Sequence, residues 1–261
     1  MSIVIVLAII LLLLLTVING KRGIKAFFSL FANYLLVVCA AVLMCKGFSP
    51  VLMALIFSFA ASAFILFFIN GINSKTVIAY ISIVCVLILV SVLIIGFGYH
   101  NRLNGFGGNL NDTLYLYSPN IPVDFSAVAV AVILISLTGA ITDTALDIST
   151  SLHEVYMNNK NSTFVDLVKS GNNMGADIMG TMVNTLFFVF LGELTAFVIA
   201  YGRYHFGFSV MINDSLFFQE IAQLFIGNIG CILVIPATIF LQSYLYTAKK
   251  KLQLIKKHTE E

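Results

Sequence analysis

The chain has 261 residues, of which 60% are hydrophobic and 10% are charged, and its formal net charge is +2. A soluble domain is usually about 45–50% apolar and about 25% charged, so this composition excludes an ordinary water-soluble globular protein. The partner that the composition indicates is the lipid bilayer, and we expect neither a nucleic-acid partner nor a cofactor.

The apolar residues gather in seven blocks, each close to the roughly 20 residues that an α-helix needs to cross the hydrocarbon core of a bilayer. The first block is apolar at nearly every position and lacks the alternation of a β-barrel strand. The sequence therefore predicts an all-α, polytopic transmembrane helix bundle of about seven spans over residues 1–246, followed by a basic tail over 247–261. The predicted spans cover approximately residues 3–18, 26–44, 51–69, 77–97, 127–142, 178–200 and 221–246.

Lysine and arginine are distributed unevenly between the two sides of these spans. One side collects 11 of them, including the five lysines of the tail, and the other side collects 3. Cytoplasmic loops of membrane proteins carry an excess of Lys and Arg. We therefore expect the C-terminus in the cytoplasm, the N-terminus outside, and the protein in the inner (cytoplasmic) cell membrane.

The connection over residues 143–177 differs from the others because acidic residues recur in it at helical spacing. We expect short amphipathic helices on the cytoplasmic side that continue from the membrane or lie against it. Ser162 or Thr163 ahead of Asp166 predicts a helix start, and Gly171 predicts a helix stop.

Polar side chains form one stripe on each of two consecutive predicted helices. With about 100° between successive residues of a helix, the members of each stripe share one face. Carboxylates within a membrane usually face a bundle interior or a wet cavity and mark ion or proton paths. We therefore predict a polar transport site between the fifth and sixth spans; solvated or structural polar faces, and a catalytic role, are the alternatives. The residues are Asp143, Asp147, Thr150 and Glu154 in the first stripe, and Asp177, Thr181, Asn184 and Thr185 in the second.

No sequence motif indicates an enzyme. His153 is followed by Glu154, but the zinc motif H-E-x-x-H requires a second histidine where this chain has Met157. The motifs G-x-S-x-G, Walker A and G-x-G-x-x-G are also absent from the sequence. We therefore expect a protein without catalytic residues.

Small residues and one proline mark the last two spans. Small side chains let the backbones of transmembrane helices approach closely, and Pro236 removes a backbone donor and should kink the seventh span, where a gating hinge is an alternative to a static kink. Glu220 is interpreted as an interfacial helix start. The glycines predicted to act in packing or as hinges are Gly171, Gly175, Gly180, Gly192, Gly227 and Gly230.

One pattern of residues extends from Gly139 to the last predicted span. It consists of Gly139, Asp143, Ile148, Glu154, Leu167, Ser170-Gly171, Gly175-x-Asp177-x-x-Gly180-Thr181-Met182-x-Asn184-Thr185-Leu186, Gly192, Glu220, Gly227, Gly230 and Pro236. This pattern resembles the YibE/F-like family of multi-pass bacterial membrane proteins, in its shorter type. The resemblance predicts a basic residue before Asp177, where this chain has Ala176, and it implies pairing with a longer paralogue.

Three functions are compatible with this sequence. The acidic stripes favour a permease-like component that moves a small solute or ion. The glycine-rich spans and the basic tail fit a non-transporting subunit that scaffolds or regulates a longer paralogue, or a homo-oligomer. An intramembrane enzyme is a third and weaker alternative.

Overall fold

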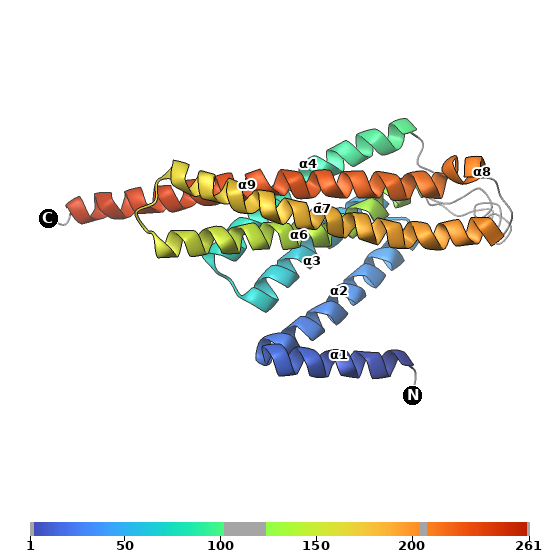
Figure 1. The fold of residues 1–261 in the computed structure, drawn as a ribbon, viewed down its shortest axis with the longest axis horizontal. Helices are drawn as coiled ribbons and strands as arrows, with labels where there is room; N and C mark the ends of the chain where they lie inside the picture. The colour runs from blue at the N-terminus through green and yellow to red at the C-terminus, as the bar shows by residue number, and fades with distance from the viewer. Residues whose placement is uncertain (1–2, 102–123, 204–207, 260–261) are drawn as a thin grey trace.

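The computed structural model describes residues 3–101, 124–203 and 208–259, and these residues are almost entirely helical (Figure 1). No strand occurs within these ranges, so the predicted all-α fold is confirmed. The helices are α1 (Ile3–Asn19), α2 (Lys21–Cys45), α3 (Pro50–Phe64) with the π-helical turn η1 (Ile65–Ile69), α4 (Ser74–Asn101), α6 (Phe125–Asn158), α7 (Phe164–Arg203), α8 (Phe208–Ile212) and α9 (Ser215–Thr259).

Within the described ranges, six helical segments are long and apolar enough to cross a membrane, and α1 is a shorter apolar helix of 17 residues. A helix of that length spans about 26 Å, slightly less than the roughly 30 Å of a typical hydrocarbon core. The protein is therefore a multi-pass membrane protein. The seventh span and the side of the membrane that each end faces stay predictions.

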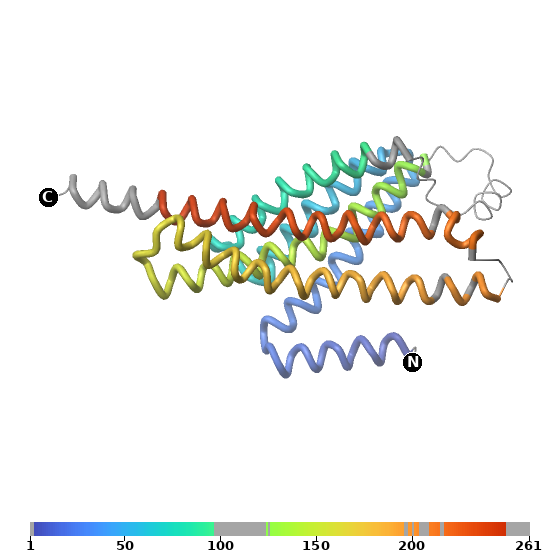
Figure 2. Tube along the Cα trace, turned by 45° about the horizontal axis from the view of Figure 1, so that its top comes forward, coloured from blue at the N-terminus to red at the C-terminus, as the bar shows by residue number. Residues whose placement is uncertain are grey.

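The centre of the bundle is formed by α4, α6 and α9, and α6 also packs on α3 and α7. Its core contains fully buried apolar side chains such as Ile83, Leu134 and Ile141, with buried hydroxyl groups such as that of Thr142 among them. The hairpin of α1 and α2 lies at the edge of the bundle (Figures 1 and 2). No residue of α1 is buried, as expected for a helix whose surface faces lipid.

The two ends of the bundle differ in how the helices are connected. We call the turn end the one where α6 passes into α7 and η1 passes into α4. We call the loop end the opposite one, where α4 and α7 end and α6 and α9 begin (Figure 1). The charge distribution predicts that the turn end is cytoplasmic.

The start of α7 follows the local signal in the sequence. The Thr163 backbone N–H donates to the Asp166 carboxylate at 3.0 Å, and the Asp166 N–H donates to the Thr163 hydroxyl at 3.3 Å, as in a capping box. The predicted stop at Gly171 is wrong, because α7 continues to Arg203. Residues 143–177 are thus the continuous ends of two long helices, joined by a turn over 159–163.

The C-terminal helix also extends further than the sequence predicted. The seventh predicted span ends at Tyr246, whereas α9 runs to Thr259 without a break. Pro236 lies inside this helix and is exposed. The basic segment after Tyr246 therefore continues the last spanning helix.

Two glycines bring α7 against α9. A Cβ built on Gly175 would lie 2.6 Å from Cγ2 of Ile235, and one on Gly171 would lie 2.8 Å from Cγ2 of Ile239. Both distances are shorter than van der Waals contact. Any side chain larger than the hydrogen of glycine would therefore force the neighbouring isoleucine or its helix to shift. This packing explains why α7 continues through Gly171, where the sequence predicted that the helix would stop.

The other predicted packing glycines differ among themselves. A Cβ on Gly230 would meet Cδ1 of Ile141 at 2.7 Å, and Gly227 has ordinary contacts. Gly180 and Gly192 have no atom within 4 Å of a built Cβ. These two glycines have open space within the single chain, and their role in a helix contact stays a prediction.

Gly175→Ala should lower the melting temperature of the purified protein relative to Gly180→Ala. Both changes gain roughly 1 kcal/mol of helix propensity, but the methyl group at position 175 is forced against Ile235, and overpacking typically costs about 1–3 kcal/mol. Thermal melting in the same detergent measures the difference, and equal melting temperatures would refute the close approach of α7 to α9.

Candidate functional site: a carboxyl pair between three helices

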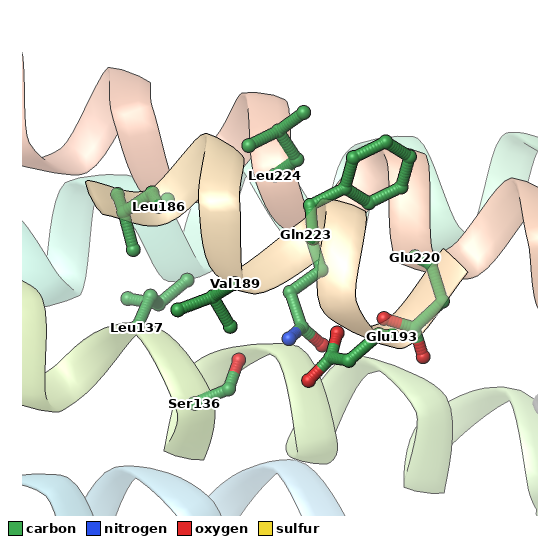
Figure 3. A pocket seen from close by; sticks show the side chains of 10 residues that line it. Ser136, Leu137, Leu186, Val189, Glu193, Glu220, Gln223 and Leu224 are labelled. Atoms are coloured by element: carbon green, nitrogen blue, oxygen red, sulfur yellow. The ribbon is translucent and has the colours of Figure 1, made fainter. Parts of the chain in front are cut away.

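A pocket of about 170 Å³ lies between α6, α7 and α9 in the half of the bundle nearer the loop end (Figure 3). Two carboxyl groups from different helices converge in it, Glu193 of α7 and Glu220 of α9. Glu193 is exposed and Glu220 is half-buried, so the pair is accessible from outside the chain. The remaining lining residues are Ser136, Leu137, Leu186, Val189, Phe190, Gln223, Leu224 and Gly227.

The Glu193 and Glu220 side chains form a hydrogen bond with each other. An ionised carboxylate is an acceptor without a donor, so this bond exists only while the pair holds a proton. Two adjacent carboxylates in a partly apolar pocket also repel each other when both are charged. With one proton shared between them, the two groups would carry a single negative charge.

Two neutral polar groups complete the pocket. The Gln223 amide lies beside the Glu193 carboxyl, and Ser136 faces them from α6 (Figure 3). The Ser136 hydroxyl donates to the Ile133 carbonyl at 2.9 Å, which leaves its oxygen free to accept or to coordinate. Carboxylate, amide and hydroxyl oxygens are the donor set that hard cations prefer. The described residues contain no group of three or more His, Cys, Asp or Glu side chains that could hold a metal ion.

A hydrogen bond at the loop end fixes the helix that carries Glu193. The Tyr201 hydroxyl, near the end of α7, donates to the Asp214 carboxylate just before α9. Burial, together with this bond and the Asp214 charge, raises the pKa of Tyr201 to about 12. The phenol therefore remains a donor at physiological pH, and the bond holds the two helices of the carboxyl pair together.

The predicted stripe on α6 lies on the same side of the helix as the pocket residue Ser136. Asp143 follows Ser136 by seven residues and Asp147 follows Asp143 by four, and such steps return to nearly the same direction around a helix. Both aspartates are exposed, as is Glu154, and Thr150 is half-buried. Asp143 and Asp147 are close enough to interact electrostatically. The stripe therefore runs along α6 from the pocket toward the turn end.

The predicted stripe on α7 faces a different direction. Gly175 faces Ile235 of α9 and Ile148 of α6, and Asp177 follows it by two residues, which is about 200° around the helix. Asp177 therefore points away from both helices. All four stripe residues, Asp177, Thr181, Asn184 and Thr185, are exposed.

The single chain therefore does not enclose the two stripes in one site. The Thr181 and Thr185 hydroxyls donate to backbone carbonyls of α7 itself, at 2.8 and 2.9 Å. Among the residues that the structure describes, the carboxyl groups of Glu193 and Glu220 do meet between helices. A role of the α7 stripe in transport stays a prediction.

The sequence interpretation missed this carboxyl pair. Glu220 was interpreted as an interfacial helix start, whereas it lines a pocket with Glu193. Glu193 was not singled out, although it is the one charged residue in the apolar block 178–200. An acid alone in a predicted span is a signal of function, so the sequence did contain an indication.

Comparison with known proteins identifies a family but no individual relative. No curated protein and no solved structure matches the chain significantly. The model of the YibE/F-like proteins matches residues 7–248, which is nearly the whole chain and includes the pocket and both stripes. The chain therefore belongs to the YibE/F-like family.

Proposed function

We propose that this protein is a permease-like component of the cytoplasmic membrane that moves protons or a small cation. The observation that carries the proposal is the meeting of Glu193 and Glu220, from two spanning helices, in one accessible pocket. Acidic residues within membrane-spanning segments are costly and usually mark ion or proton paths.

The chemistry of the pair suits exchange. While protonated, the pair has a single negative charge and an internal hydrogen bond. Loss of the proton leaves two negative charges beside the oxygens of Gln223 and Ser136, and a cation or a returning proton relieves their repulsion. The α6 stripe supplies further carboxylates on the way to the turn end. The most distant of its aspartates, Asp147, lies about 16 Å along the helix from Ser136.

Ion flux into liposomes tests this proposal. The purified chain is reconstituted with a pH-sensitive dye inside, and a proton gradient is imposed with or without Na⁺ or K⁺ outside. We expect a dye response faster than in empty liposomes, and a dependence on the cation would identify exchange. A response equal to that of empty liposomes under every condition would contradict the proposed activity.

A second candidate function rests on the exposed face of α7. Of its spanning window 6% is buried within the chain, against 56% for α6, and the exposed face carries Asp177, Thr181 and Asn184. Polar residues at membrane depth usually face another helix. This face therefore favours a subunit that binds a longer paralogue or its own copy.

A further inference from the structure

A cluster of basic side chains lies at the start of α2. Lys21, Arg22 and Lys25 belong to the first turns of this helix, and all three are exposed. Lys25 reaches over the ring of Phe68 in η1, with 6.0 Å between its Nζ atom and the ring centroid. The cluster therefore lies where the turn between α1 and α2 comes beside η1, on the side of the turn end (Figures 1 and 2).

Among the described residues, the elements around these cations offer them no acidic partner. Helix α2 packs on α1, α3 and η1, and the sequence contains no Asp or Glu before Asp112. Cations in the first turn of a helix also oppose its dipole, so the cluster does not stabilise α2 itself. Its three positive charges therefore favour an anion from outside the chain.

The surface that continues from the cluster along α2 is apolar and exposed. Steps of four and three residues place Lys21, Lys25 and Phe28 on one face of the helix, and Leu35 continues this face seven residues later. Phe28 is 59% exposed, and Leu35 and Phe68 are exposed as well. Cations at the end of a helix, followed by an apolar face toward its centre, match a ligand with an anionic head and a hydrocarbon chain.

The π-helical turn η1 holds one of these cations in place. The Phe68 ring stacks on Phe64 with 4.7 Å between the centroids, and it offers its π-system to the Lys25 ammonium. This contact does not neutralise the positive charge of Lys25. π-Helical turns are rare and often occur at functional sites, so the position of η1 beside the cluster supports a binding site.

We propose that Lys21, Arg22 and Lys25 bind the headgroup of an anionic phospholipid, with an acyl chain of this lipid along the exposed apolar face of α2. Arginine pairs with phosphate through two parallel hydrogen bonds, and lysine acts as a point charge. Helix α1 packs on α2, and none of its residues is buried. A headgroup held at the start of α2 and beside η1 would therefore fix the α1–α2 hairpin at the membrane surface.

Tryptophan fluorescence tests the proposal, because the chain contains no tryptophan. Phe28→Trp places a single reporter on the exposed face next to the cluster. The full chain is reconstituted in phosphatidylcholine vesicles that contain phosphatidylglycerol or phosphatidylcholine with brominated acyl chains, which quench tryptophan on contact. From this quenching, we expect phosphatidylglycerol to bind at the reporter about fivefold more tightly than phosphatidylcholine, or more, since about fivefold corresponds to one basic residue near an anionic surface.

Matched variants separate this site from the other basic residues of the chain. Phe225→Trp places the reporter at an exposed position of α9 and should show no preference between the two lipids. In the Phe28→Trp background, Lys25→Gln should reduce the preference, and replacement of all three cations by glutamine should abolish it. Lys46→Gln, at the other end of α2, should leave it unchanged. Lys25→Gln keeps two of the three cations and so decides the question even if the triple variant does not insert.

Two results would overturn the proposal for the lipid. The first is equal quenching by the two brominated lipids in Phe28→Trp, or a preference that neither Lys25→Gln nor the triple replacement changes. The second is displacement of phosphatidylglycerol by inorganic phosphate at constant ionic strength, because the cluster would then be a site for a free anion.

Discussion

Replacing Glu220 by Gln should reduce ion flux through the reconstituted protein to the level of empty liposomes. The Glu193–Glu220 hydrogen bond depends on a proton that can leave. In Glu220→Gln the amide supplies an N–H donor that does not dissociate at any physiological pH. The remaining carboxylate of Glu193 would keep a permanent hydrogen-bond partner. The pocket could then no longer exchange the shared proton, and it could no longer bind a cation between two negative carboxylates.

Glu193→Gln should have the same effect by the same argument, and the double variant should be no worse than either single one. Residues that act as one unit give such non-additive losses. Glu260→Gln, the same chemical change at the C-terminal end of the chain, should leave the flux unchanged. If each single variant retained about half of the flux, the two carboxyls would act separately and not as a pair.

Local features of this fold could be predicted from the sequence because their causes are local. The spans follow from runs of apolar residues, and the start of α7 follows from Thr163 and Asp166, which lie three residues apart and bond each other. The error at Gly171 has a tertiary cause. Glycine is common directly after the end of a helix. Here Gly171 instead lies inside α7, where its missing side chain makes room for Ile239 of α9.

The candidate site depends on contacts that spacing alone does not supply. Glu193 and Glu220 belong to different helices, and they meet because α7 packs on α9. Helical periodicity does place Asp177, Thr181 and Asn184 on one face of α7, but it leaves open the direction of that face. The packing of Gly175 against α6 and α9 turns the polar face outward, and this contact decides which acids share a pocket.

Asp143→Asn and Asp177→Asn are the same change at two exposed carboxyls and should give different results. From the sequence, loss of activity is expected for both, and most of all for Asp177. Asp143 lies on the α6 stripe that continues from the pocket, so Asp143→Asn should lower the flux of the purified chain. Asp177 points away from α6 and α9, so Asp177→Asn should leave that flux intact.

The second variant should instead change association. If the exposed α7 face binds another protein in the membrane, a polar group lost from it weakens a contact that lipid cannot replace. A cysteine at position 180, where a side chain has open space, allows this to be measured in native membranes by cross-linking. We expect a cross-linked product, either with a second copy or with a longer paralogue, and a smaller yield when Asp177→Asn is added. Loss of flux in purified Asp177→Asn together with normal flux in Asp143→Asn would contradict this division, because the α7 face would then carry the ion and the α6 stripe would not.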